Sequence, residues 1–252
     1  MKNKIAFITG ASRGLGKDMA LNLAKEGVTI LFTYHSNQNK ADEVITEIEA
    51  LGVKAKAFVY HANNPLSGRE LLAEVTAFLQ KENGHPNFDF LINNAGTGLN
   101  KTIEQTQAID FDEMFQIHLK SVYFLTQAAI PYINQGGSIV NISSGLTRFS
   151  FPGASAYAIM KGGVEVFTRY LAKELGDRKI RSNVVAPGAI ATDFGNGANR
   201  DNEAKRTIIK NITALGRVGE AEDVGGVVAF LCSEKANWIN GQRIEVSGGM
   251  LL

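Results

Sequence analysis

The fold of this chain is decided near its start, by the stretch Thr9-Gly10-Ala11-Ser12-Arg13-Gly14-Leu15-Gly16. A short apolar run from Ile5 to Ile8 precedes the stretch, and a segment of helical period follows it. Glycines at a strand-to-helix turn let the backbone approach a bound group closely, and the free N–H groups at the helix start attract an anion. The spacing G-x-x-x-G-x-G differs from the G-x-G-x-x-G of the usual dinucleotide fingerprint. The stretch therefore predicts an anion-binding turn, with a purely structural tight turn as the alternative.

Outward from this turn, short runs rich in Val, Ile and Phe alternate with longer segments of helical period. That alternation is typical of repeated βα units around a parallel sheet. The predicted strands are Lys4–Thr9, Val28–Tyr34, Lys54–Val59, Phe88–Asn93, Ser138–Ile142, Ile180–Ala186 and Gln242–Val246. The predicted helices are Gly14–Glu26, Lys40–Leu51, Leu66–Lys81, Asp110–Ile133, Ala154–Leu175, Asp201–Ile212 and Glu220–Cys232. Because the strands are apolar on both faces, we expect a single doubly wound α/β domain over residues 1–252, with helices on both faces of the sheet.

Composition excludes several function classes. The 252 residues carry 26 Lys plus Arg against 25 Asp plus Glu, so no strong field exists to attract nucleic acid or an acidic membrane. The single cysteine, Cys232, cannot form an intrachain disulfide, and the four histidines lie too far apart in sequence to indicate a metal site. The apolar run at the N-terminus is too short for a signal peptide or a membrane span. We therefore expect a cytoplasmic protein without metal, nucleic-acid or membrane partners.

The end of the second predicted strand bears on which dinucleotide the glycine turn binds. Folds that prefer NAD place a carboxylate about 20 residues after the turn, but no acid occurs between Val28 and Lys40. Arg13 lies inside the turn, where its guanidinium can face the additional 2′-phosphate of NADP, and Ser36 or Asn37 can hydrogen-bond that phosphate. The sequence therefore favours NADP(H) over NAD(H). The alternative for Arg13 is a solvated loop cation.

A second group of polar residues lies in the middle of the chain. Tyr157 and Lys161 are four residues apart in a segment of helical period, so they project from the same face. A nearby ammonium stabilises a phenolate and lowers the pKa of the phenol from its usual value of about 10. Ser144 ends the preceding strand, and Asn94 ends the fourth strand, at the carboxyl edge of the sheet. This context favours a proton-transfer site over a surface pair without a role.

Taken together, these motifs resemble the short-chain dehydrogenase/reductase family over essentially the whole chain. They arrive in the family's order: Thr9-Gly10-x-x-x-Gly14-x-Gly16, Asn93-Asn94-Ala95-Gly96, Ser144, Tyr157-x-x-x-Lys161 and Pro187-Gly188. The closing Val246-Ser247-Gly248-Gly249 is similar to the family's Asp-Gly-Gly ending, with Ser247 in place of the Asp. The resemblance implies a Rossmann-type fold. The members that look nearest are NADPH-dependent 3-oxoacyl reductases and related carbonyl reductases.

The resemblance also implies roles for individual residues. Tyr157 is expected to be the general acid/base, Lys161 to bind the nicotinamide ribose and depress the tyrosine pKa, and Ser144 to hydrogen-bond the substrate carbonyl. The residues expected to contact the cofactor are Gly10, Ser12, Arg13, Gly14, Leu15, Gly16, Tyr34, His35, Ser36, Asn63, Asn94, Ala95, Gly96, Tyr157, Lys161, Pro187, Gly188, Ile190 and Thr192.

The chain departs from the family's pattern at two places. His118 stands where the family usually has an asparagine that completes a Ser-Tyr-Lys-Asn tetrad and holds a water. A neutral imidazole donates one hydrogen bond and accepts one, so we expect His118 in the proton relay, where it adds a group that titrates near neutrality. The alternative is that His118 caps a kink in its helix. After the third strand, His61-Ala62 replaces the family's Asp-Val, which leaves the adenine contact to a backbone group or to Asn63.

We therefore expect an enzyme that transfers hydride between NADP(H) and a small-molecule carbonyl or alcohol. The alternatives are an NAD-dependent alcohol dehydrogenase and a non-catalytic protein that senses NADP. Residues 187–214 are expected to form a substrate lid, and the residues that either line an apolar pocket or belong to the core are Phe149, Phe151, Phe194 and Met250. The resemblance implies a homo-oligomer, a tetramer or a dimer, with the helices Asp110–Ile133 and Ala154–Leu175 at its interfaces.

Overall fold

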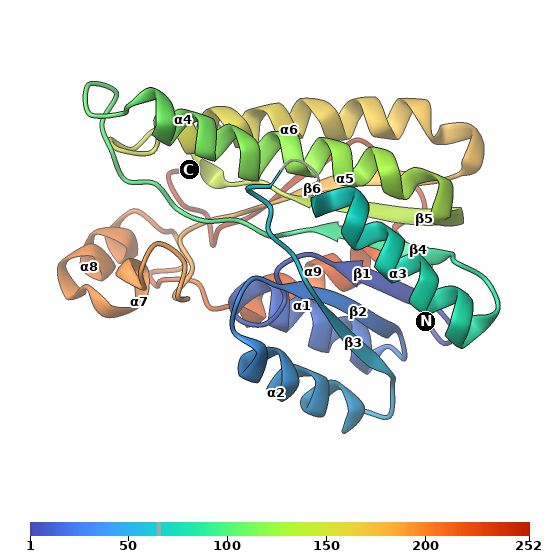
Figure 1. Cartoon of the computed structure of the whole chain (residues 1–252). Coiled ribbons are helices and arrows are strands. Elements are labelled where there is room, and N and C mark those ends of the chain that lie inside the picture. Colours follow the sequence, from blue (N-terminus) through green and yellow to red (C-terminus); the bar gives the residue numbers. More distant parts are fainter. Residues whose placement is uncertain (65–66) are drawn as a thin grey trace.

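The computed structural model describes residues 1–64 and 67–252, and the described chain forms a sheet of seven parallel strands (Figure 1). The strands are β1 (Ile5–Ile8), β2 (Thr29–Tyr34), β3 (Ala55–Val59), β4 (Phe88–Asn93), β5 (Ile133–Ile142), β6 (Arg181–Pro187) and β7 (Arg243–Val246). Their order is β3-β2-β1-β4-β5-β6-β7, so the winding reverses between β1 and β4. Ligands of doubly wound sheets bind at the carboxyl ends of the strands beside such a reversal. The predicted Rossmann-type fold is confirmed.

Helices cover both faces of this sheet (Figure 1). The helices on one face are α1 (Gly14–Lys25), α2 (Gln38–Glu49) and α9 (Glu222–Cys232), and those on the other are α3 (Ser67–Asn83), α5 (Ser121–Ala129) and α6 (Ser155–Glu174). Met19 and Leu23 of α1 are fully buried in the first layer, and Leu79 of α3 is almost fully buried in the second. The two apolar layers explain why the strands are apolar on both faces.

The segment predicted as one helix, Asp110–Ile133, is not one helix. It consists of α4 (Ala108–Phe115), a π-helical turn (Gln116–Lys120), α5 and a 3₁₀ turn (Ile130–Tyr132). A π turn places one more residue in each turn than an α-helix does, and such turns are frequent at functional sites. Pro131, which has no backbone N–H, lies in the closing 3₁₀ turn. β5 therefore begins at Ile133, well before the predicted start at Ser138.

The segment after β6 also differs from its prediction. The predicted helix Asp201–Ile212 is divided into α7 (Ala198–Asp201) and α8 (Glu203–Asn211). The side chain of Asn202 accepts a hydrogen bond from the Lys205 amide at 2.9 Å, so it caps a new helix. Leu66, where another predicted helix begins, lies outside the described residues. Among residues 1–64 and 67–252, no helix combines the length and the apolar character that a membrane crossing requires.

Buried amides and hydroxyls join the middle of the sheet to the helices on one face. The Asn93 amide donates to Thr126 Oγ1 at 2.9 Å and to Asn141 Oδ1 at 2.8 Å. The Asn141 amide in turn donates to Thr168 Oγ1 at 2.8 Å. A buried polar group without a partner is costly, so a satisfied chain of this kind fixes the relative positions of β4, β5, α5 and α6. These elements carry the polar residues that the sequence predicts at the site.

The glycine turn after β1 is packed without spare room. A Cβ added at Gly16 would lie 2.2 Å from the carbonyl oxygen of Gly10 and 2.6 Å from the side-chain amide of Asn94. By contrast, a Cβ added at Gly162 in α6 would meet no atom within 4 Å. Gly16 is therefore required by the close approach of the Gly10 carbonyl group and the Asn94 side chain. No such approach requires a glycine at position 162.

We expect Gly16→Ala to lower the free energy of unfolding by about 1–3 kcal/mol, the usual cost of overpacking. The matched change Gly162→Ala should leave stability unchanged or raise it by up to about 1 kcal/mol, since alanine is the better helix former. Thermal and urea unfolding of the two variants and the parent measures the difference. A Gly16→Ala variant as stable as the parent would show that the turn has more room than this packing allows.

Candidate active site

The glycine turn presents the start of α1 at the carboxyl edge of the sheet. Gly10 and Gly14 both have positive φ angles, +69° and +53°, which glycine adopts without strain. The Gly10 amide donates to Thr33 Oγ1 at 2.9 Å, which ties the turn to β2. The side chain of Arg13, the N-cap residue of α1, makes no capping hydrogen bond to the helix. The N–H groups of the first turn therefore keep the geometry of an anion site.

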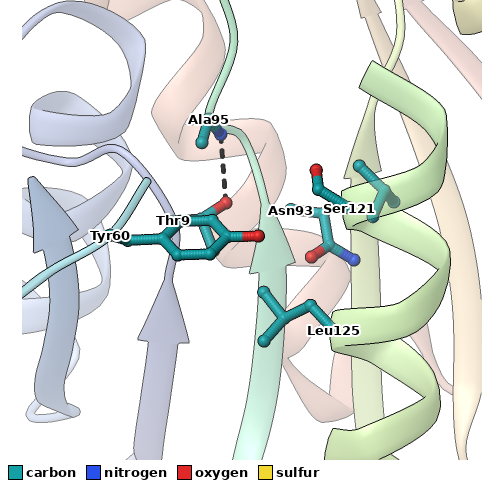
Figure 2. Close-up of a pocket in the computed structure, with 7 residues that line it drawn as sticks. Thr9, Tyr60, Asn93, Ala95, Ser121 and Leu125 are labelled. Atoms are coloured by element: carbon teal, nitrogen blue, oxygen red, sulfur yellow. Dashed lines mark hydrogen bonds between the residues drawn. The ribbon is translucent and has the colours of Figure 1, made fainter. Parts of the chain in front are cut away.

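Asn94 joins this turn to the end of β4. Its side-chain amide donates to the carbonyl oxygens of Thr9 and Gly10, each at 2.9 Å. In the reverse direction, Thr9 Oγ1 accepts from the amides of Asn94 at 2.9 Å and Ala95 at 3.0 Å. Figure 2 shows the Ala95 bond to Thr9 and the recess beside it, which Tyr60 also lines. The role found for Asn94 is thus to hold the turn itself.

Ser144, Tyr157 and Lys161 come together at the same edge. Ser144 follows β5, Tyr157 lies in the first turn of α6, and the Ser144 side chain lies close enough to the phenol to lower its pKa. One turn further along α6, the ammonium of Lys161 donates to the carbonyl oxygen of Ile142 at 2.7 Å and lies 5.6 Å from the centre of the Tyr157 ring. The structure therefore brings together the three residues that the sequence motifs singled out.

The electrostatics of the pair differ from the expectation. Burial raises the pKa of Tyr157 above its usual value, and the hydrogen bond with Ser144 only partly opposes that shift. Burial also lowers the pKa of Lys161 to about 8. The expected net depression of the tyrosine pKa is not found, because desolvation is the largest influence on the phenol and the Lys161 ammonium donates to Ile142.

Two charged residues that the sequence analysis missed hold the backbone around Ser144 in place through hydrogen bonds. Glu165 of α6 accepts from Ser143 Oγ and Thr147 Oγ1, both at 2.7 Å, and from Arg243 Nε at 2.9 Å. Arg243 also donates to the carbonyl oxygen of Ser144 at 3.3 Å. This network fixes the backbone on both sides of the serine. A glutamate inside an otherwise apolar helical segment was the available signal, because such a carboxylate needs a partner.

His118 lies in the π-helical turn, fully buried against Tyr157. Its ring centre is 4.9 Å from that of Tyr157 at nearly a right angle, and its Nε2 lies 2.8 Å from the carbonyl oxygen of Thr97. That contact assigns the proton to Nε2, which leaves Nδ1 as a buried acceptor without a partner among the described residues. Gly96 is pressed against the ring, since a Cβ there would lie 2.7 Å from Cε1.

The expectation that His118 titrates near neutrality is wrong. Burial, together with the smaller effect of the Lys161 charge, lowers the pKa of His118 to about 3, and the hydrogen bond with Thr97 opposes this shift only in part. The imidazole is therefore neutral throughout the pH range in which enzymes usually work. A role in proton relay would have to use its neutral form alone.

The remaining predicted cofactor residues fall into two groups along the carboxyl edge. Tyr34 ends β2, and the other residues of the first group follow β2 or β3: His35, Ser36 and Asn63. The rings of His35 and His61 are in contact, with centres 4.9 Å apart. Pro187 ends β6, and the other residues of the second group follow that strand: Gly188, Ile190 and Thr192. Thr192 lies over the glycine turn, where a Cβ on Gly14 would approach it to 3.5 Å. No group of three potential metal ligands occurs in the part of the chain that the structure describes.

An α/β fold with an anion-binding glycine turn after β1, beside a serine, a tyrosine and a lysine, defines a class of nicotinamide-dependent oxidoreductases. The family described as Enoyl-(Acyl carrier protein) reductase matches residues 10–251. The 3-oxoacyl-[acyl-carrier-protein] reductase FabG of Staphylococcus epidermidis is 35% identical over 252 residues, which cover 99% of this chain and 100% of that protein. The chain therefore belongs to the short-chain dehydrogenase/reductase family.

Solved structures are similar over the same length. The reductase LugOII, described as catalysing keto-reduction in lugdunomycin biosynthesis, is 37% identical with a TM-score of 0.94, covering 100% of this chain and 99% of that one. The landomycin C-6 ketoreductase LanV, solved with bound NADP and rabelomycin, is 33% identical with a TM-score of 0.91 and covers 99% of this chain and 97% of that one.

The neutral state of His118 leads to two expectations for a His118→Asn variant, one for the pH profile of activity and one for the pH dependence of stability. If the variant is active, its pH profile of kcat/KM between pH 5 and 7 should superimpose on that of the parent in shape, because neither side chain changes charge there. The substrate must be a carbonyl compound that does not ionise in this range. An acid limb near pH 6.5 that disappears in the variant would contradict the buried, neutral imidazole.

The second expectation concerns how the free energy of unfolding of the parent and the variant changes with pH. The unfolded chain binds a proton at His118 near pH 6.5, whereas the folded chain does so only near pH 3. Falling pH between these values should therefore cost the parent up to about 1.4 kcal/mol per pH unit relative to the variant.

Proposed function

We propose that this protein is an NADP(H)-dependent carbonyl reductase. One observation carries the proposal: the side chains of Ser144 and Tyr157 lie together at the same sheet edge as the glycine turn, with the Lys161 ammonium one helical turn behind. This arrangement places a hydrogen-bond donor for a carbonyl oxygen, and a proton source for the same oxygen, beside a site suited to a dinucleotide.

In the proposed reaction the bound dinucleotide supplies hydride to the carbonyl carbon. Ser144 orients the carbonyl oxygen and stabilises the negative charge that develops on it, and Tyr157 donates its phenolic proton to that oxygen. Lys161, charged below its pKa of about 8, favours the resulting phenolate over the phenol. His118 contributes a fixed, neutral acceptor at Nδ1 behind the tyrosine ring. The network of Glu165 and Arg243 keeps Ser144 in position.

The donors at the turn fit a phosphorylated dinucleotide. Uncapped N–H groups at the start of α1 suit the pyrophosphate, and Arg13 and Lys40 supply positive charge for a 2′-phosphate. No carboxylate stands at the end of β2 to bind an unsubstituted ribose. A similar ketoreductase was solved with NADP bound. These features favour NADP(H) over the alternative of an NAD-dependent alcohol dehydrogenase.

We propose a carbonyl substrate of apolar or aromatic character. Phe194 stands 5.9 Å from Tyr157, and Phe149 and Phe151 are in edge contact at 5.7 Å. Phe151 and Phe194 are partly exposed, so they can cover a substrate. Similar proteins are named as a 3-oxoacyl-[acyl-carrier-protein] reductase and as a landomycin C-6 ketoreductase. We further propose that residues 1–252 form one domain and that residues 187–214 form a lid over this substrate.

Replacing Tyr157 with Phe removes the transferable proton and keeps the ring. We expect kcat for NADPH-dependent ketone reduction to fall by about 10²–10⁴-fold, with the Kd for NADPH nearly unchanged. Tyr170→Phe is the matched control, because Tyr170 lies on the same helix with 63% of its surface exposed. Near-normal turnover in Tyr157→Phe would remove the assigned role. NADPH binding without turnover in the parent, on a panel of ketones, would favour the alternative of a cofactor sensor.

We also propose that copies of the chain associate through α5 and α6. Aromatic side chains gather there: Tyr123 and Phe124 of α5 are each about two-fifths exposed, and the Tyr123 ring lies 4.7 Å from that of Phe167 on α6. Tyr170, three residues after Phe167 on the same helix, is also exposed. A patch of this kind is typical of a subunit interface.

Light scattering during gel filtration should give a mass well above the 27.2 kDa of one chain. Phe124→Glu, which places a charge in the patch, should shift the population toward smaller species. Leu51→Glu, at an exposed apolar residue just after α2, is the control that should not. A monomeric parent would overturn the association.

A further inference from the structure

One carboxylate in the segment after β6 is surrounded by positive charge from three separate elements. Asp193 Oδ2 lies 3.4 Å from the Arg13 guanidinium of the glycine turn and 3.5 Å from Lys40 Nζ in the first turn of α2. Its other oxygen pairs with Arg200 of α7. The Arg200 guanidinium and Lys40 hold the pKa of this carboxyl below its usual value. Asp193 is thus ionised wherever the enzyme works.

The position of Asp193 is set by its neighbour Thr192, which lies directly over Gly14 of the glycine turn. The segment therefore crosses the turn on the side where Arg13 and Lys40 stand. Single exposed ion pairs contribute little to stability, and all three cations here are about half exposed. Asp193 matters because two of the three cations that it pairs with, Arg13 and Lys40, are those that the proposed function assigns to the 2′-phosphate.

We propose that Asp193 is a specificity-determining residue whose carboxylate competes with the 2′-phosphate of NADP(H) for Arg13 and Lys40. With the carboxylate present, the two cations and Asp193 carry a net charge of about +1 toward the phosphate, and without it they carry +2. The residue thereby limits the preference for the phosphorylated dinucleotide. This inference rests on the proposed function and adds to it a residue that the sequence analysis did not single out.

Asp201 provides a matched control on the same segment. Its carboxylate binds the Arg200 guanidinium through two hydrogen bonds of 2.8 Å, and it pairs with neither Arg13 nor Lys40. Asp193→Asn and Asp201→Asn remove the same charge from neighbouring positions. Only the first change frees the two cations that face the phosphate.

The test measures Kd values for NADPH and NADH by fluorescence titration of the parent, Asp193→Asn and Asp201→Asn. Removal of one like charge from the cations that would face a phosphate dianion should tighten NADPH binding about tenfold. NADH binding should change by less than about twofold, and Asp201→Asn should leave the ratio of the two Kd values close to that of the parent. Adenosine 2′,5′-bisphosphate, used as a competitor, should show the same tightening, since it carries the phosphate without a nicotinamide.

Two further variants keep the result interpretable. Asp193→Glu retains the charge and should keep the parent's ratio, which separates charge from a disturbed fold. Arg13→Ala should weaken NADPH more than NADH, and its effect should be larger in the Asp193→Asn background, where the guanidinium is free for the phosphate. An unchanged or lower preference for NADPH in Asp193→Asn overturns the inference alone. A parent that binds neither dinucleotide overturns the proposed function.

Discussion

The geometry of the site depends on one pair of hydrogen bonds, which the Asn94 side-chain amide donates to the carbonyl oxygens of Thr9 and Gly10 at the start of the glycine turn. Asn94 directly follows β4 and the glycine turn follows β1, and the winding of the sheet reverses between these two strands. Gly16 is pressed against the same amide, so the turn has little freedom to move relative to β4. Because Asn93 is bonded in turn to Asn141 on β5, the dinucleotide turn and the strand that carries Ser144 are held in one frame.

The burial of the reacting groups has electrostatic consequences within this frame. Burial opposes every charge it surrounds, so it raises the pKa of Tyr157 and lowers those of Lys161 and His118. Tyr157 and His118 are therefore neutral at working pH, and only Lys161 carries charge. A reaction that builds negative charge on a carbonyl oxygen gains from that single ammonium. Below neutral pH, the activity of the protein should then depend on the stability of the fold more than on protonation of His118.

The sequence allowed the fold and the family to be predicted, and it singled out the candidate site residues that the structure places at one sheet edge, for physical reasons that also explain the failures. Phe88–Asn93 is apolar on both faces and ends in a polar pair, so its bounds were predicted exactly as found. The π turn around His118 leaves no mark in hydrophobic period, so one long helix was predicted there. The pKa of His118 could not be predicted, because burial depends on packing between distant elements. Asp193 meets Arg13 across 180 residues, a contact that no local pattern indicates.

The most direct test of the account follows the hydride itself. NADPH carrying deuterium at C4 of the nicotinamide, in each of its two configurations, is incubated with the protein and a panel of an aromatic ketone, an aliphatic ketone and a 3-oxoacyl thioester. The account predicts that mass spectrometry finds the deuterium on the carbinol carbon of at least one product, from one configuration only, while the hydroxyl proton comes from solvent. Oxidation of NADPH without transfer of the label to any product carbon would contradict it.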